Sequence, residues 1–163
     1  MKALSLCNIF LFLIFLTGMP GVSGAQDDLK TGNPVDELVF PGDEPAHKVV
    51  YQFNKADWEY QESVLFSVGA MLRKYGDNIR IVVVAIGPGI HVLAKEPNRA
   101  VPPMIKSRVA SLAQYGVEFH ACGNTMKTQK WGEDDMLPFA TVVEVGAADL
   151  MELQEQGYAY INW

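Results

Sequence analysis

The stretch IRIVVVAI at residues 79–86 decides the fold of this chain. Apart from Arg80 it is an uninterrupted apolar run, mostly of β-branched residues, and the sequence Gly-Pro-Gly follows it directly. β-branched residues favour strands, and a strand without alternation of apolar and polar residues is typical of one buried on both faces. Such strands occur mainly in parallel sheets, because the helices that connect parallel strands cover both faces. The stretch therefore predicts the interior of a parallel sheet.

Helical and extended segments alternate on either side of this stretch. Apolar residues at three- and four-residue spacing with a terminal Gly or Pro indicate helices, and short apolar runs indicate strands. We expect strands over 47–53, 79–86, 117–122, 141–145 and 158–161, helices over 58–75, 102–115, 132–139 and 149–156, and a polar loop over 127–131. Because parallel neighbours need crossover helices, this alternation predicts one α/β domain over 47–163, a three-layer α/β/α sandwich with a mainly parallel five-stranded sheet.

The composition is that of an ordinary globular protein with an excess of acidic residues. The 163 residues are 49% hydrophobic and 20% charged, which is enough for one domain with one core. The net charge of −6 and the pI near 5.0 argue against a nucleic-acid partner, which requires a basic face. The sequence contains no phosphate-binding loop motif, no CxxC pair and no HExxH motif. We therefore expect neither a cofactor nor a bound metal.

The first 25 residues have the features of a signal peptide. The apolar run 4–16 is too short to span a bilayer comfortably, and small residues at Ser23 and Ala25 fit cleavage by signal peptidase. A short membrane anchor is the alternative. Cleavage after Ala25 would leave 163 − 25 = 138 residues in the periplasm or outside the cell, with no membrane attachment. The polar, turn-rich segment 26–46 would form a flexible lead-in to the domain.

The segment VEFHACGNTM at residues 117–126 places a cysteine where a strand ends. Signal cleavage would remove Cys7, so Cys122 would be the only cysteine of the mature protein. An unpaired cysteine in an oxidising compartment is either shielded from solvent or kept for chemistry. Two interpretations follow, a reactive thiol that handles sulfur or a small buried hydrophobic side chain.

Two histidines are candidates for a role beside this thiol. His120 lies two residues before Cys122, so both side chains point to the same face of the sheet. It would serve either as a base or as a structural histidine within the strand. His91 would either line a pocket or belong to a loop. Together with Cys122 the two histidines lack the spacing that is typical of a metal site.

Two segments carry a resemblance to a known family. The segment YGVEFHACGNTM at 115–126 resembles the cysteine segment of the DsrE/DsrF-like family of sulfur-oxidation and sulfur-relay proteins, and LQEQGYAYI at 153–161 resembles its closing helix and strand. The resemblance covers about residues 47–163. It implies a flavodoxin-like sheet with strand order 2-1-3-4-5, assembly into trimers or hexamers, and a persulfide formed on Cys122.

That strand order would gather several polar residues at one crevice. Ligands of doubly wound sheets bind at the carboxyl ends of the strands, where the strand order reverses. With strand one beside strand three, Asn54 and Lys55 would face Cys122 and Asn124. We therefore predict Cys122 as the catalytic residue and Asn54, Lys55, Asn124 and His120 as binding residues.

The predicted function is that of a sulfur carrier, which accepts sulfane sulfur on Cys122 and passes it to a partner protein. Any turnover would be that of a sulfurtransferase. With no second cysteine in the mature chain, sulfur would leave to an external acceptor and not through an internal disulfide. The alternative is a non-catalytic, oligomeric periplasmic binding or structural protein with a buried, inert cysteine. The rate of thiol labelling separates the two.

Overall fold

The segment that begins at Ile79 forms the middle strand of a five-stranded sheet. In the computed structural model, which describes residues 42–163, this strand is β2 (Ile79–Ala85). All of its residues except Arg80 are buried. It pairs in parallel with β1 (His47–Phe53) on one side and with β3 (Glu118–Cys122) on the other. The prediction of a strand covered on both faces is confirmed.

The remaining strands extend the sheet on both sides. β4 (Ala140–Val143) pairs in parallel with β3, and β5 (Ala159–Ile161) pairs in parallel with β1. The order is therefore β4-β3-β2-β1-β5. The predicted α/β fold with a mainly parallel five-stranded sheet is confirmed, whereas the predicted strand order 2-1-3-4-5 is wrong. Strands one to four follow one another across the sheet, and only β5 returns to the far side of β1.

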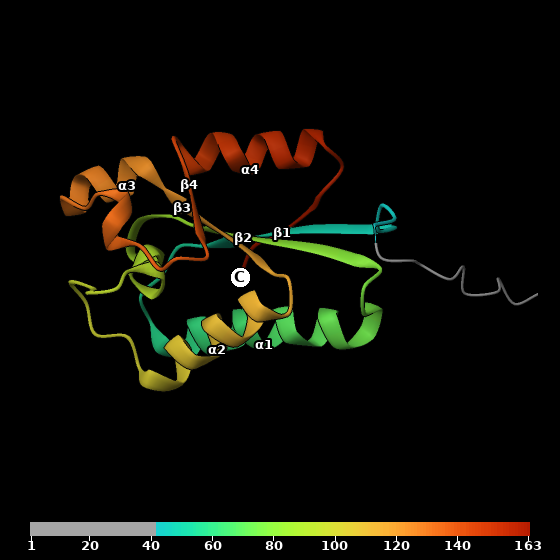
Figure 1. Cartoon of the computed structure of the whole chain (residues 1–163), viewed down its shortest axis with the longest axis horizontal. Helices are drawn as coiled ribbons and strands as arrows, with labels where there is room; N and C mark the ends of the chain where they lie inside the picture. The colour runs from blue at the N-terminus through green and yellow to red at the C-terminus, as the bar shows by residue number, and fades with distance from the viewer. Residues whose placement is uncertain (1–41) are drawn as a thin grey trace, which may run out of the picture. The chain divides into compact units, whose positions relative to one another are not determined.

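The positions of the helices explain this order. Figure 1 shows α1 (Trp58–Tyr75) and α2 (Pro103–Gln114) on one face of the sheet and α4 (Gly146–Glu155) on the other. Crossovers between parallel strands are almost always right-handed, so two successive helices share a face when the strands advance in one direction. The order 2-1-3 would have put α1 and α2 on opposite faces. Both helices have an apolar stripe, but a stripe does not say which face of a sheet it covers.

Two hydrophobic clusters of unequal size fill the space between the sheet and its helices. The larger one, between the sheet and the pair α1 and α2, contains 23 buried residues, among them Phe53, Ile81 and Phe119. The smaller one lies under α4 and comprises Val50, Val82, Val84, Leu150, Leu153 and Tyr158. Neighbouring residues of β1 and β2 alternate between the two clusters, as the two-residue period of a strand requires.

Two segments near the cysteine differ from their predictions. The expected helix over 132–139 is only a short 3₁₀ turn, η2 (Glu133–Asp135). Pro138 explains this, because proline within a helix removes a hydrogen bond and clashes with the preceding turn. A helix that was not predicted, α3 (Gly123–Gln129), directly follows β3 and includes part of the expected loop. The other short turn, η1 (Gly87–Leu93), follows β2.

The predicted signal peptide over 1–25 lies outside the described residues, as does most of the predicted lead-in over 26–46. Within residues 42–163, no helix has the length and apolar character that crossing a membrane requires.

Candidate functional site

Cys122 lies between a strand and a helix. It is the last residue of β3 and the residue that immediately precedes α3. The first backbone N–H groups of a helix have no partner within that helix. The strand ends at the cysteine as predicted, and the chain then turns directly into α3, which places such N–H groups close to the thiol.

A second helix begins against the same thiol. The backbone N–H of Gly146, the first residue of α4, donates a hydrogen bond to Cys122 Sγ at 3.3 Å. A Cβ atom at position 146 would lie 2.9 Å from Cys122 Cβ and 2.9 Å from Ile86 Cγ1, closer than such atoms approach one another. Only glycine therefore allows the start of α4 to come this close to the sulfur.

A hydroxyl group near the sulfur also affects the pKa of the thiol. The Thr125 hydroxyl accepts the backbone N–H of Gly87 at 3.0 Å, so its own proton is free to be donated to the Cys122 sulfur. Burial raises the pKa of the Cys122 thiol, but the Thr125 hydroxyl and nearby backbone N–H groups hydrogen-bond to the thiolate and outweigh burial. Those N–H groups belong to Gly146, Thr125 and Asn124, and the Asn124 N–H contributes least because it also donates to the Glu144 carbonyl at 3.2 Å. The pKa of the thiol therefore lies below its ordinary value.

A cavity of about 400 Å³ opens beside the sulfur. Its walls include Cys122, Asn124, His91 and Arg99. Cys122 itself is only 3% exposed, so the thiol is part of the cavity wall and does not protrude from the surface. The site is thus accessible to a small reagent that enters the cavity.

The structure separates Asn54 and Lys55 from this cavity. β2 lies between β1 and β3, so the crevice predicted between the ends of strands one and three does not form. The backbone N–H of Asn54 donates to the Tyr60 hydroxyl at 3.2 Å, and Lys55 Nζ donates to the carbonyl of Trp163 at 3.2 Å. Of the four predicted binding residues, only Asn124 lines the cavity.

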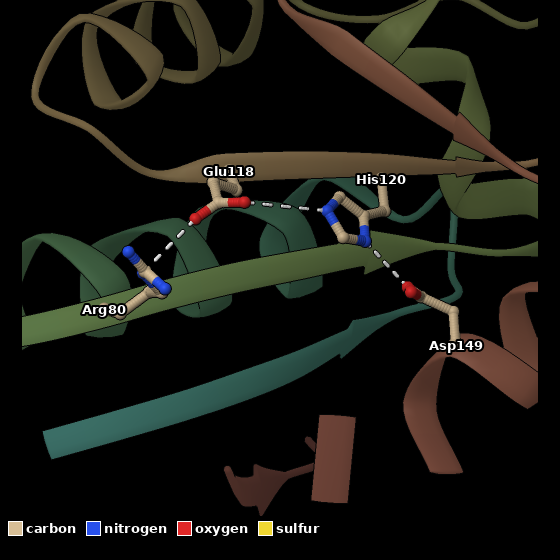
Figure 2. Close-up of polar contacts among 4 residues, drawn as sticks. All are labelled: Arg80, Glu118, His120 and Asp149. Carbon is tan, nitrogen blue, oxygen red and sulfur yellow. Dashed lines mark hydrogen bonds and ion pairs between the residues drawn. The ribbon is translucent and has the colours of Figure 1, made fainter. Parts of the chain in front are cut away.

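His120 belongs to a chain of residues on the α4 face of the sheet that includes the charged side chains of Glu118 and Asp149. Figure 2 shows it between Glu118 and Asp149. Its Nδ1 donates to Asp149 Oδ2 at 2.8 Å, and its Nε2 lies 3.9 Å from Glu118 Oε2. Glu118 Oε1 lies in turn 3.7 Å from Arg80 Nε. His120 and Cys122 do share a sheet face, since both contact the first residues of α4, but His120 is tied to Asp149 and does not line the cavity.

His91 is the histidine that lines the cavity. It is 1% exposed, its ring packs edge-on against Trp131 at 5.1 Å between centroids, and its Nδ1 has no hydrogen-bond partner within residues 42–163. Burial and then the positive charge of Arg99 lower its pKa, so the ring is neutral at pH 7. Across the same described range, no three His, Cys, Asp or Glu side chains are grouped as a metal ion would require.

Three residues of this site were not identified from the sequence. Gly146 and Thr125 act on the sulfur, and Arg99 lines the cavity. Gly146 follows a predicted strand end, where a glycine is common. Arg99 lies in a loop, and no pattern in the sequence predicts where that loop lies relative to Cys122. Thr125 could have been identified from its spacing, because it lies three positions after Cys122 and residues three apart are neighbours at the start of a helix.

The geometry agrees with a family assignment. The model of the DsrE/DsrF-like family matches residues 41–163. The chain belongs to this family. DsrE/DsrF-like proteins are in general connected with sulfur relay. No curated protein is similar enough to this chain to count as a match.

Solved structures share the DsrE-like fold of this chain. A protein of unknown function from Methanobacterium thermoautotrophicum, MTH1491, is 30% identical with a TM-score of 0.61, and the match covers 72% of this chain and 99% of that one. The ychN protein from E. coli is 11% identical with a TM-score of 0.61, over 72% of this chain and 99% of that one. BT1422 from Bacteroides thetaiotaomicron is 13% identical with a TM-score of 0.53, and the match covers 71% of this chain and 94% of that one. At their low identity, the last two show the fold alone.

Proposed function

We propose that this protein accepts sulfane sulfur as a persulfide on Cys122 and passes it to an acceptor protein. The observation that carries the proposal is the hydrogen bond that the Gly146 N–H donates to Cys122 Sγ at 3.3 Å, and the nearby Thr125 hydroxyl lowers the thiol pKa further. The thiolate is the nucleophile in sulfur transfer, and these donors favour it over the thiol. Membership of a family connected with sulfur relay supports the same chemistry.

The reaction is an exchange at sulfur. The Cys122 thiolate attacks the outer sulfur of a donor, a new S–S bond forms, and the donor's remaining group leaves with the electron pair of the broken bond. Within residues 42–163 Cys122 is the sole cysteine, so no neighbouring thiol is present there to convert the persulfide into a disulfide. The outer sulfur is then passed on when the thiolate of an acceptor attacks it.

One observation favours a second candidate function. Cys122 is 3% exposed, and free cysteines buried to this degree often serve only in packing. The alternative is a non-catalytic, oligomeric periplasmic binding or structural protein with an inert cysteine. Export to the periplasm or medium and assembly into trimers or hexamers are part of both hypotheses, and both features stay predictions from the sequence and the family resemblance.

The deciding experiment is intact-mass analysis after incubation with polysulfide. We expect the wild-type protein to gain the mass of one or more sulfur atoms, to lose it again on reduction, and Cys122→Ser to gain none. An equal gain in Cys122→Ser would rule out Cys122 as the acceptor. An unmodified wild type, together with slow alkylation by iodoacetamide, would favour the inert cysteine.

The pH dependence of alkylation tests the electrostatic part of the proposal. Because the thiol pKa is lowered, we expect the alkylation rate to reach half its maximum below pH ~8.5, the ordinary thiol value. Thr125→Val removes one donor, about 0.5–1.5 kcal/mol, and should shift the midpoint upward and slow alkylation at neutral pH about two- to tenfold. Thr125→Ser keeps the hydroxyl and is the matched control. Equal alkylation rates for the two variants would show that the Thr125 hydroxyl does not lower the pKa of the thiol.

A further inference from the structure

The cavity beside Cys122 is lined by a cation and by no carboxylate. Arg99 lines it, whereas none of the described residues around it is Asp or Glu. The chain as a whole has 19 acidic and 13 basic residues, so a cavity without an acid is a local departure from its composition. A cavity whose charged lining residue is a cation favours an anionic ligand over a cationic one.

The charge of Arg99 is available to a ligand. Within residues 42–163 no carboxylate forms an ion pair with its exposed guanidinium. Arg99 lines the same cavity as the buried His91 ring, and its positive charge contributes, after burial, to the lowered pKa of that ring. The loop is tied to the thiol's own helix, because Asn98 Nδ2 donates to Gln129 Oε1 of α3 at 3.2 Å. Arg99 is therefore held near the helix that begins at the sulfur.

Several polar groups of the cavity have donors left for a ligand. Gln129 uses its amide oxygen for Asn98, which leaves its amide N–H groups for another acceptor. The Thr128 hydroxyl is already committed, since it donates to the carbonyl of Asn124 at 3.0 Å. The buried His91 ring contributes an Nδ1 without a partner among the described residues. A guanidinium with amide N–H groups beside it matches the oxygens of a small oxyanion.

We propose that this cavity binds the oxyanion end of a small sulfur donor, with Arg99 holding the oxygens and the donor's sulfane sulfur meeting Cys122. The inference rests on the proposed function, and it names the substrate class of the same site. Thiosulfate is the simplest such donor. Its approach to a thiolate brings two anions together, and the Arg99 charge reduces their repulsion.

The step balances without any further reactant. The Cys122 thiolate attacks the outer sulfur of thiosulfate, and the new Sγ–S bond forms as the S–S bond of thiosulfate breaks. Sulfite leaves with that electron pair, and the outer sulfur stays on the protein as the persulfide anion. The proton of the thiol has already gone to solvent. Sulfite is thus both the leaving group and the ligand that the oxyanion site should hold.

The first test compares two donors in matched variants. Arg99→Gln removes the proposed oxyanion ligand, and Lys106→Gln removes one positive charge from an exposed position of α2 outside the cavity. We expect persulfide formation from thiosulfate, followed by intact mass, to slow about tenfold in Arg99→Gln and to stay unchanged in Lys106→Gln. The rate of persulfide formation from an alkyl persulfide, which has no oxyanion, should change less than about twofold in both variants. An equal loss with both donors, or no loss with thiosulfate, overturns the inference.

The second test measures binding without turnover. Titration calorimetry with sulfite on Cys122→Ser should show binding that weakens about tenfold when Arg99→Gln is added and not when Lys106→Gln is added. Absence of binding at millimolar sulfite, or binding that Arg99→Gln leaves unaltered, contradicts the oxyanion site. If sulfite binds as expected but no donor loads wild-type Cys122, the oxyanion site stands and the persulfide function fails.

Discussion

The two faces of the sheet differ in what their side chains do. The hydrophobic cluster that joins one face to α1 and α2 contains 23 buried residues, counting those of the helices and of η1. The face under α4 holds six, and beside them lie the thiol of Cys122 and the charged chain through His120 and Asp149. The same five strands supply both faces, so the difference arises from the alternation of side chains along each strand.

This contrast separates stability from chemistry. Burial of apolar area is the main favourable term in folding, and the α1/α2 face supplies most of it. The α4 face contributes little to that term and can therefore accommodate polar groups and a close backbone approach at the sulfur. We expect substitutions on the first face to alter stability with little effect on the thiol, and those on the second face to alter the thiol more than stability.

Phe119→Ala should have the largest effect on stability. Phe119 is 1% exposed and lies on β3, three residues before Cys122, but it points into the α1/α2 core. The free energy of unfolding should fall by about 3–5 kcal/mol in urea denaturation, because a large cavity replaces the ring. Phe66→Ala, at a residue that is 63% exposed on α1, should cost less than about 1 kcal/mol. Comparable losses for both would contradict the assignment of the core.

Gly146→Ala should disturb the thiol as well as the fold. The added methyl would lie 2.9 Å from Cys122 Cβ, so α4 must move and withdraw its N–H from the sulfur. We expect a loss of about 1–3 kcal/mol in unfolding free energy and an upward shift of the pH midpoint for alkylation. Gly132→Ala meets no atom within 4 Å and should change unfolding by less than about 0.5 kcal/mol. A Gly146→Ala protein with an unshifted alkylation midpoint would show that the hydrogen bond does not act on the thiol.

Asp149→Asn should have a smaller effect on stability than Phe119→Ala and Gly146→Ala. The asparagine retains an oxygen that can accept from His120 Nδ1, so the loss should be about 0.5–1.5 kcal/mol. Glu152→Gln, an exposed change of the same type on α4, is the control and should have no measurable effect. A loss as large as that of Phe119→Ala would mean that the charged chain, and not the apolar core, dominates stability.

The sequence predicts the elements of this fold better than their arrangement. The strand over 47–53 and the helix over 58–75 have the predicted bounds, because apolar periodicity and the Asp57 cap are local signals. The strand order is not local, since it depends on which face each helix covers. α3 is missed because Gly123 and Asn124 are residues that usually end an element, and here they begin one.

The candidate site is predicted only in part for the same reason. Cys122 and Asn124 lie next to each other in the sequence and share the cavity in the structure. Asn54 and Lys55 depended on the strand order, and β2 separates them from the thiol. Arg99 and Gly146 come from distant segments, and only packing in three dimensions brings them to the sulfur.

The lengths of the outermost strands limit how copies of this chain can meet. β4 has four residues and β5 has three, so the two edges of the sheet expose few unpaired backbone groups. An incoming strand would gain few ladder hydrogen bonds there, which protects the protein from edge-to-edge aggregation. The short edges therefore make one continuous sheet through two subunits an unfavourable way for copies of this chain to join.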